Sequence, residues 1–247
     1  MEYNETLKLL LQSKSVRVFE DREITAEEKQ AIFQAAMAAP TAGNQQLYTI
    51  LDITDPAIKE KLVETCDHQP FIAQAKMVLI FCADVRRWVD LFEEAGAAPR
   101  KPGPGDLLLA CSDACIAAQN AVVAAQSLGI GACYIGDVME NREAQCELLG
   151  LPEYVFPAAM VVFGYPTQQQ VERPKPQRCR VDEIVMENRY RVRDGQALRS
   201  MTEKDWKQVG FETWATRFCD RKYNSDFSRE MSRSVEEYLR EYCGKNS

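Results

Sequence analysis

The segment Asp106–Leu128 reads DLLLACSDACIAAQNAVVAAQSL, and its residues are almost all apolar or small. Its composition predicts one long helix, which Gly129 ends. A helix that is apolar on every side has to be buried on every side. We therefore expect Asp106–Leu128 to be the central helix of the core or to be buried in a dimer interface.

Helices and strands alternate on both sides of this segment. Thr25 and Glu28 have the spacing of a capping box, so a helix begins there and runs to about Ala39, where Pro40 stops it. Further helices are expected at 3–12, 56–66, 84–94 and 141–149, and strands at 47–53, 76–83, 131–135 and 158–163. By itself, this alternation favours a parallel α/β sheet.

The chain changes in character after Tyr165. The stretch 166–180 is rich in Gln, Pro and basic residues and predicts a surface loop without helix or strand. Two or three polar helices are expected after it, too polar to form a core of their own. We therefore expect residues 1–165 to form the core and residues 166–247 to be a basic loop and helical extension of the same domain.

Composition narrows the class of protein. The chain has 247 residues, a formal net charge of -7 and a pI near 5.0. This acidic balance argues against a nucleic-acid partner. No apolar run reaches membrane-spanning length and the acidic N-terminus lacks a signal-peptide pattern, so we expect a cytoplasmic protein without a membrane partner.

Several common catalytic sites are disfavoured. The nine cysteines are scattered and there is one histidine, so we expect reduced thiols and no metal site. The chain also lacks a dinucleotide-binding glycine loop, a P-loop and a G-x-S-x-G elbow. Both a Rossmann dehydrogenase and a serine hydrolase are therefore disfavoured.

The segment Ser13–Phe19 places two hydroxyls and two cations within five residues. Alternate residues of an extended segment point the same way, so Ser13, Ser15 and Arg17 can converge on one ligand, with Lys14 beside them. Charge-assisted hydrogen bonds of this kind suit a phosphate. A solvated basic turn is the alternative when the segment is taken alone.

Two more loops are candidates for ligand contact. Ala39–Gln46 is a run of small residues that ends in amides, which would let a flat ligand approach the backbone. Cys133–Asp137 ends a strand with a glycine that can expose a backbone N–H. Each of them, taken alone, also fits an ordinary connection between elements.

Taken together and in order, these pieces resemble the flavin-dependent nitroreductase family, in particular its oxygen-insensitive NAD(P)H nitroreductase and flavin reductase branch. The matching pieces are SVRVF at 15–19, APTAGN at 39–44, FCAD at 81–84, YIGD at 134–137 and RKYNSDFS at 221–228. The resemblance covers nearly the whole chain.

The resemblance implies an α+β fold, with a mixed, mostly antiparallel sheet surrounded by helices in an intertwined homodimer. It also implies non-covalent FMN at the dimer interface and NAD(P)H as electron donor. The reaction implied is ping-pong: hydride passes from NAD(P)H to the flavin and then to a small-molecule acceptor, a nitroaromatic, a quinone or free flavin.

The resemblance also assigns the site residues. Ser13, Lys14 and Ser15 would contact the ribityl and phosphate oxygens, and Arg17 would lie near N1 and O2 of the flavin ring and stabilise its reduced form. The catalytic residues implied are Arg17, Gly136 and Asp137, the last two through a backbone N–H aimed at N5. The other ring contacts implied are Gln69 at the pyrimidine edge, Tyr134 and Ile135, and, from the partner subunit, Pro40, Thr41, Ala42, Gly43 and Asn44.

The late basic loop would close the phosphate site. One residue is inserted there relative to the family pattern, so Arg178 is the first candidate and Lys175 the second. For a 2′-phosphate of NADPH, the candidates are Arg191, Arg193 and Arg199. Two alternatives to the reductase stay open, a flavin-binding or sensing module without turnover and a reductive dehalogenase-like relative that uses the same FMN cradle.

Overall fold

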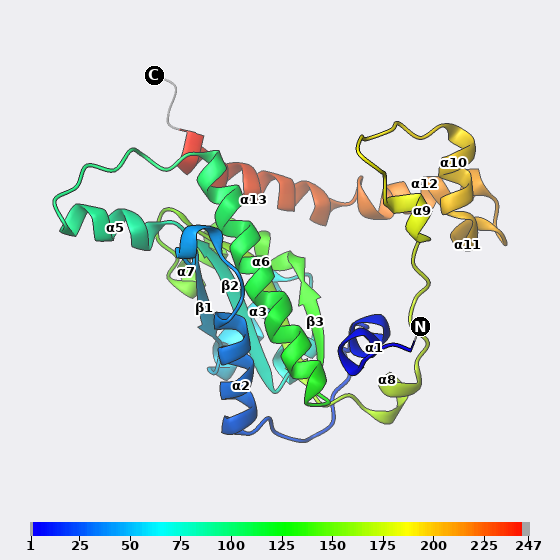
Figure 1. The fold of residues 1–247 in the computed structure, drawn as a ribbon, viewed down its shortest axis with the longest axis horizontal. Helices are drawn as coiled ribbons and strands as arrows, with labels where there is room; N and C mark the ends of the chain where they lie inside the picture. Colours follow the sequence, from blue (N-terminus) through cyan, green and yellow to red (C-terminus); the bar gives the residue numbers. More distant parts are fainter. Residues whose placement is uncertain (1, 244–247) are drawn as a thin grey trace. The chain divides into compact units, whose positions relative to one another are not determined.

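The computed structural model describes residues 2–243 and contains one four-stranded sheet (Figure 1). The spatial order is β1–β2–β4–β3, and every neighbouring pair is antiparallel. The strands are β1 (Tyr48–Asp52), β2 (Met77–Asp84), β3 (Gly131–Ile135) and β4 (Val155–Gly164). The α+β class implied by the resemblance is confirmed, and the parallel sheet that alternation favoured is wrong.

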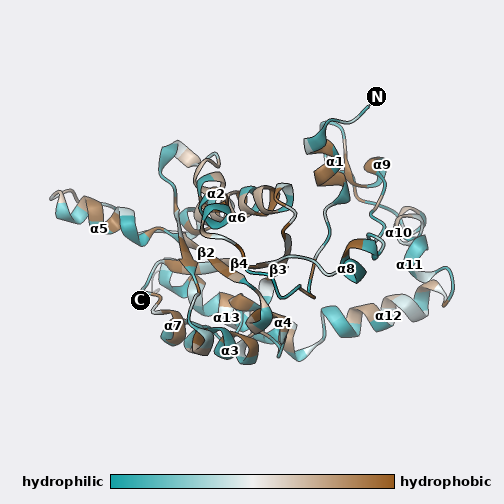
Figure 2. Ribbon diagram, turned by 90° about the horizontal axis from the view of Figure 1, so that it is seen from below, coloured by the Kyte–Doolittle hydropathy of each residue, from teal (hydrophilic) through white to brown (hydrophobic). Residues whose placement is uncertain are grey.

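The two central strands carry the core. All residues of β2 are buried, and its side chains alternate between two hydrophobic clusters, with Leu79 and Phe81 in one and Val78 and Ile80 in the other. Figure 2 shows β2 in the hydrophobic colours. Strand β4 begins three residues before the expected start at 158, although it contains Pro157. A register shift opposite, between Phe81 and Cys82, accommodates this proline.

Two helices cover one face of the sheet, α2 (Ala26–Met37) and α6 (Pro104–Ser127). The capping box predicted at Thr25 is present. Helix α6 has the length and apolarity of a membrane-crossing helix, but 44% of the apolar stretch that meets this test is buried inside the protein. Its buried alanines pack on the sheet, whereas Leu108 is 66% exposed. The expectation of burial on every side is therefore wrong for the single chain, and the dimer alternative stays a prediction.

The opposite face of the sheet is covered by shorter helices. They are α3 (Pro56–Thr65), α4 (Phe71–Gln74), α7 (Arg142–Leu149) and the 3-10 helix η2 (Gly136–Met139). Leu62 and Ile72 are fully buried there against Ile80 and Val162 of the sheet. This second layer ends beside β3, where η2 follows the strand directly.

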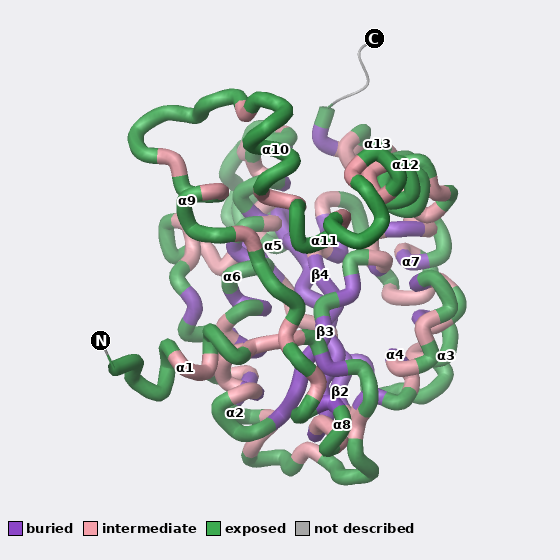
Figure 3. Tube along the Cα trace, turned by 90° about the vertical axis from the view of Figure 1, so that its right-hand side faces the viewer, coloured by how far each residue is buried: buried purple, intermediate pink, exposed green. Residues whose placement is uncertain are grey.

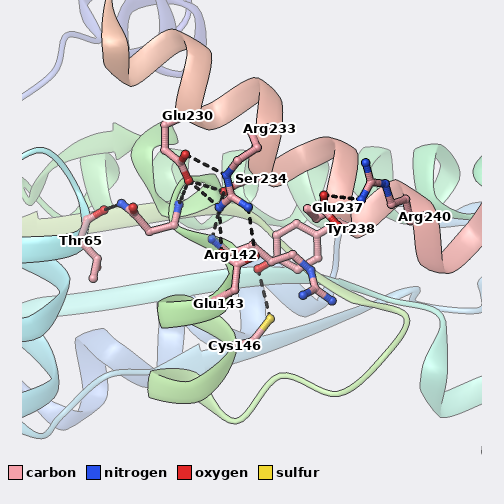
Figure 4. Close-up of polar contacts among 11 residues, drawn as sticks. Thr65, Arg142, Glu143, Cys146, Glu230, Arg233, Ser234, Glu237, Tyr238 and Arg240 are labelled. Atoms are coloured by element: carbon pink, nitrogen blue, oxygen red, sulfur yellow. Dashed lines mark hydrogen bonds and ion pairs between the residues drawn. The ribbon is translucent and has the colours of Figure 1, made fainter.

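The C-terminal helix α13 (Asp226–Cys243) returns to the core from Glu230 onward. Tyr238 is 1% exposed and packs edge-on against Phe156, with ring centroids 4.9 Å apart. Figure 4 shows how charged residues fasten the helix to α7: Arg233 pairs with both Glu143 and Glu230. These contacts join residues 230–243 and residues 2–173 into one compact unit.

Three helices complete this unit, α1 (Glu5–Gln12), α5 (Arg86–Glu94) and α8 (Gln168–Glu172). Helix α8 lies inside the stretch 166–180, so the expectation of a loop without helix is wrong there. Thr167 precedes the helix in extended conformation, and a short helix of Gln and Glu residues gives no apolar pattern that would reveal it.

Residues 174–229 form a second compact unit. Its helices are α9 (Val181–Ile184), α10 (Gly195–Met201), α11 (Glu203–Trp206) and α12 (Phe211–Lys222). Phe211 packs on both Trp206 and Trp214, with ring centroids 5.7 and 6.3 Å apart. None of the residues in these four helices is buried, and Figure 3 draws them mostly as exposed. The division of the sequence into core and extension stays a prediction.

Candidate active site

The N-terminal segment (Ser13–Phe19) runs along the outer edge of β3. The Val16 N–H donates to the Ala132 carbonyl oxygen at 2.9 Å, and Phe19 bridges to Pro166. Two glycines make room for it. A Cβ atom on Gly131 would lie 2.7 Å from Val16 Cγ2, and one on Gly164 would lie 2.6 Å from Phe19 Cδ1. Because both distances are too short for real contacts, only glycine lets the segment lie this close.

Three cations gather at this segment, two of them fixed by backbone oxygens. Lys14 Nζ donates to the carbonyl oxygens of Val171, at 2.7 Å, and of Arg173. The Arg173 guanidinium donates to the Ser15 carbonyl oxygen. Within residues 2–243, no ion pair joins Lys14, Arg17 or Arg173 to a carboxylate. Uncompensated positive charge on an acidic protein fits an anion such as the phosphate of FMN.

Ser15 and Arg17 share one face of the segment, as alternation predicts. Burial raises the pKa of the Cys133 thiol, while the contacting Arg17 and Ser15 side chains lower it. The Arg17 guanidinium also lies 5.8 Å from the centre of the Phe71 ring. Ser13 is held separately, because its hydroxyl accepts from Gln126 Nε2 at 2.6 Å.

The strand-end turn lies next to Gln69. Gln69 Nε2 donates to Asp137 Oδ2 and to the Cys66 carbonyl oxygen, both at 3.0 Å. The two residues before Gln69, Asp67 and His68, have φ values of 58° and 52°, an uncommon conformation outside glycine. The hydrogen bond between Gln69 and Asp137 joins two segments that lie 68 residues apart in the sequence.

The rest of the turn is open to a ligand. Gly136 is exposed, while Ile135 is buried. Tyr134 is 41% exposed, and its hydroxyl donates to Gln119 Oε1 of α6 at 3.3 Å. The structure thus places Ser15 and Arg17 against β3 at Ala132 and Cys133, and Gln69 against Asp137 just after the strand.

A buried carboxylate holds the Pro40–Asn44 loop. Asp113 of α6 is 3% exposed and accepts hydrogen bonds from the Thr41 hydroxyl, from the Ala42 N–H at 3.1 Å and from the Leu47 N–H at 3.2 Å. The loop includes a short 3-10 helix, η1 (Ala42–Asn44), in which Gly43 and Asn44 both have positive φ. Asp113 therefore holds this loop, with its positive-φ residues, against α6.

Within one chain, this loop and the N-terminal segment lie far apart. The loop binds α6 at Asp113, whereas Ser13 binds the same helix at Gln126. Thirteen residues of helix separate the two positions, which is about 20 Å at 1.5 Å per residue. A single chain therefore does not bring the two predicted halves of the flavin site together.

An apolar pocket of about 420 Å³ opens beside the Pro40–Asn44 loop. Trp88 and Phe92 of α5 line it together with Leu109 of α6, and Gln45 lies at its edge. The stretch 97–102 between α5 and α6 forms another wall.

The two late basic candidates belong to the second unit. Lys175 is partly buried and Arg178 is exposed within residues 174–229, and their part in a phosphate site stays a prediction. Arg173, which is the last residue of the core unit before them, was not predicted as a site residue but contacts Ser15. It opens the basic run of the late loop, which is the signal that could have identified it.

Comparison with known proteins assigns this chain to a family. The model of the nitroreductase family matches residues 10–165. The FMN reductase (NADPH) of Bacillus subtilis is 30% identical over 205 residues, 82% of this chain and 81% of the relative. The oxygen-insensitive NADPH nitroreductase of Salmonella typhimurium is 34% identical over 201 residues, 81% of this chain and 80% of the relative.

Solved structures agree. The NADPH:FMN oxidoreductase of Vibrio harveyi, solved in complex with NAD⁺, superposes with a TM-score of 0.81 at 26% identity, covering 96% of this chain and 98% of that one. The NfrA1 nitroreductase of B. subtilis gives a TM-score of 0.78 at 28% identity, covering 92% of this chain and 98% of that one.

Proposed function

The chain belongs to the nitroreductase family, and on that premise we propose that it is an FMN-dependent oxidoreductase that passes hydride from NAD(P)H to nitroaromatic, quinone or flavin acceptors in a ping-pong reaction. The observation that supports this most is the cluster of Lys14, Arg17 and Arg173, which carries no carboxylate partner within the described chain. Of this cluster, Arg17 lies against Cys133, three residues before the exposed Gly136.

The phosphate end of the cofactor would be held by Ser13, Lys14 and Ser15, together with Arg173. Two of the cations are already oriented by backbone carbonyls, so binding an anion requires little further ordering of their side chains. Arg178 and Lys175 are proposed to add to this end from the late loop. Because a phosphate contact is remote from the reacting ring, we expect them to affect affinity more than rate.

At the ring, this chain supplies charge and orientation. FMN, when bound, accepts a hydride from NAD(P)H and delivers it to the acceptor. Arg17 places a fixed positive charge beside the ring and so favours the reduced, more negative cofactor. Gly136 and Asp137 offer backbone N–H groups, and Gln69 keeps its carbonyl oxygen for the pyrimidine edge while its amide nitrogen binds Asp137.

A homodimer would complete the site. The Pro40–Asn44 loop and the N-terminal segment lie about 20 Å apart along α6 in one chain, so both can line one flavin only if they come from different subunits. The exposed Leu108, Leu109 and Ile116 on α6 are available to pack in such a dimer. We also place the protein in the cytoplasm, because all nine cysteines are free.

NADPH is the proposed donor, as it is the nucleotide named for several relatives. Of the three arginines considered for its 2′-phosphate, Arg199 is already paired with Glu212 and stacked on Phe211. Arg193 donates to the Glu183 carbonyl oxygen. Arg191 is the proposed contact, because no ion pair or hydrogen bond of its guanidinium is found among the described residues.

An anaerobic titration tests the function. The purified protein should be yellow, bleach when NADPH is added without oxygen, and recover its colour when a quinone or nitroaromatic follows. FMN that binds but stays oxidised with both NADPH and NADH would instead favour a sensing module. Protein that neither carries nor binds FMN would contradict both functions.

A further inference from the structure

A buried acid lies at the end of η2, one turn beyond the proposed hydride site. Glu140 is 4% exposed, and its Oε1 atom has no hydrogen-bond partner among residues 2–243. A buried carboxylate without a cation is costly, whereas a protonated carboxyl is much less so. The surroundings therefore favour the form of Glu140 that carries a proton.

Among the described residues, the charges that act on Glu140 come from three carboxyl groups. Burial, followed by the charge of Asp137 and a hydrogen bond with it, raises the pKa of Glu140 to about 7, and the charges of Asp67 and Glu230 add to this. Glu230 itself stays charged, because Arg233 lowers its pKa to about 2. The nearby guanidinium is thus already paired and does not neutralise Glu140.

Asp137 lies between Gln69 and Glu140. Gln69 Nε2 donates to its Oδ2 atom at 3.0 Å, and a hydrogen bond joins its carboxyl group to that of Glu140. Asp137 is half-buried, and the neighbouring Gly136 is exposed. The pair therefore extends from the buried Glu140 to the half-buried Asp137, which is next to the exposed Gly136.

We propose that Asp137 and Glu140 share one proton and deliver it to the acceptor as the acceptor takes up the hydride. This inference rests on the proposed function. A quinone becomes a hydroquinone by gaining one hydride and one proton. The hydride comes from the reduced cofactor; the proton leaves the carboxyl pair as its O–H bond breaks and a new O–H bond forms on the acceptor.

The pair is left with two negative charges, which a proton from water relieves once the product has gone. Asp137 contacts the acceptor in this scheme, so it is the catalytic acid. Glu140 acts through Asp137 as the proton reserve. If Glu140 had only a structural role, its replacement would not change how the oxidative half-reaction depends on protons.

Stopped-flow measurements on the FMN-loaded protein separate these roles. Glu140→Gln keeps the size of the side chain and removes its acidity, and Glu147→Gln makes the same change at an exposed position of α7. Reduction by NADPH should be unchanged in both. Oxidation by benzoquinone at pH 6 should be about 10- to 100-fold slower in Glu140→Gln only, as for loss of a general acid.

The dependence of the oxidation rate on pH and on deuterated water gives a second readout. In the native protein, oxidation should slow as the pH rises through about 7 and should be slower in deuterated water, and both effects should vanish in Glu140→Gln. Carboxyl NMR of protein labelled with ¹³C-glutamate should show one glutamate titrating near that pH, absent from the variant.

Two results would overturn the inference while leaving the function intact. One is oxidation of Glu140→Gln at the native rate at pH 6 after normal reduction by NADPH. The other is an NMR titration that places Glu140 in the ordinary glutamate range. Failure of NADPH to reduce any of the three proteins would instead refute the proposed function, and this inference with it.

Discussion

Replacing Asp113 with alanine removes the acceptor that holds the Pro40–Asn44 loop against α6. Three donors lose their partner: the Thr41 hydroxyl, the Ala42 N–H and the Leu47 N–H. Hydrogen bonds to a charged group contribute about 1.5–3 kcal/mol each. Thr41 and Ala42 are half-buried and water can replace their bonds in part, whereas Leu47 is 4% exposed and its N–H is left unsatisfied.

The expected loss of unfolding free energy is therefore about 3–5 kcal/mol, a large part of the stability of an ordinary domain. It would be measured by urea denaturation of the FMN-free protein, with Ser112→Ala as a control that removes one exposed hydrogen bond on the same helix. Because the loop would no longer hold its positive-φ backbone, FMN affinity should also fall by about tenfold or more, a change of about 1.4 kcal/mol.

Asp113→Asn separates charge from hydrogen bonding, since the amide keeps one acceptor oxygen of nearly the same position. The loss of unfolding free energy in Asp113→Asn should lie between the losses in Ser112→Ala and Asp113→Ala. A loss below about 1 kcal/mol in Asp113→Ala, with native FMN affinity, would refute the reasoning, because one unsatisfied buried N–H alone should cost about that much. The loop would then hold its shape without the carboxylate.

Four further changes test other contacts. Gly131→Ala puts a Cβ atom 2.7 Å from Val16 Cγ2, so thermal unfolding should show a destabilisation of about 1–3 kcal/mol. Arg17→Ala should weaken FMN retention and slow flavin reduction in stopped flow, and unchanged values would remove Arg17 from the site. Arg178→Ala should raise the dissociation constant of FMN with little change in the rate of reduction, as measured by fluorescence titration and stopped flow. Compared with the native protein, Glu140→Gln should be more stable at pH 8 than it is at pH 5, because the native pKa of Glu140, about 7, lies above the unfolded value near 4.5. The unfolded chain then loses its proton first, and native stability falls between these pH values by about 2.5 kcal/mol at about 1.36 kcal/mol per pKa unit.

Controls exist for two of these changes. A Cβ atom added to Gly105 would meet no neighbouring atom within 4 Å, so Gly105→Ala should not destabilise the protein. Glu147→Gln should show no difference in stability between pH 5 and pH 8 relative to the native protein. Equal urea midpoints for Glu140→Gln and the native protein at pH 8 would mean that Glu140 ionises like an exposed glutamate.

Local signals in the sequence predicted most of the elements. The capping box at Thr25, the continuous apolar run of β2 and the small-residue run of α6 are each complete within one stretch of chain. Strand direction is not local, because a helix between two strands can return the chain to either end of the sheet. The antiparallel order therefore came from the family resemblance and not from the alternation.

The missed residues are those whose role depends on distant partners. In the sequence, Asp113 is an isolated polar residue of an apolar helix, and its partners at Thr41 and Ala42 lie more than 70 residues away. Glu140 has the sequence context of an ordinary surface glutamate, and only the folded chain shows that it is buried beside Asp137. Motif matching identified the residues expected to touch the cofactor. It did not identify the buried residues next to them, such as Asp113 and Glu140.

The course of the N-terminal segment has a consequence for the integrity of the sheet. Strand β3 is an outer strand, and an uncovered outer strand offers its N–H and C=O groups to any other chain. Ser13–Phe19 covers this edge where Ser15 pairs with Ala132, whereas Phe19 pairs with Pro166, beyond the end of β4. We therefore expect a ligand that holds the segment in place to protect this edge from pairing with other chains, so that FMN-free protein aggregates more readily than FMN-loaded protein.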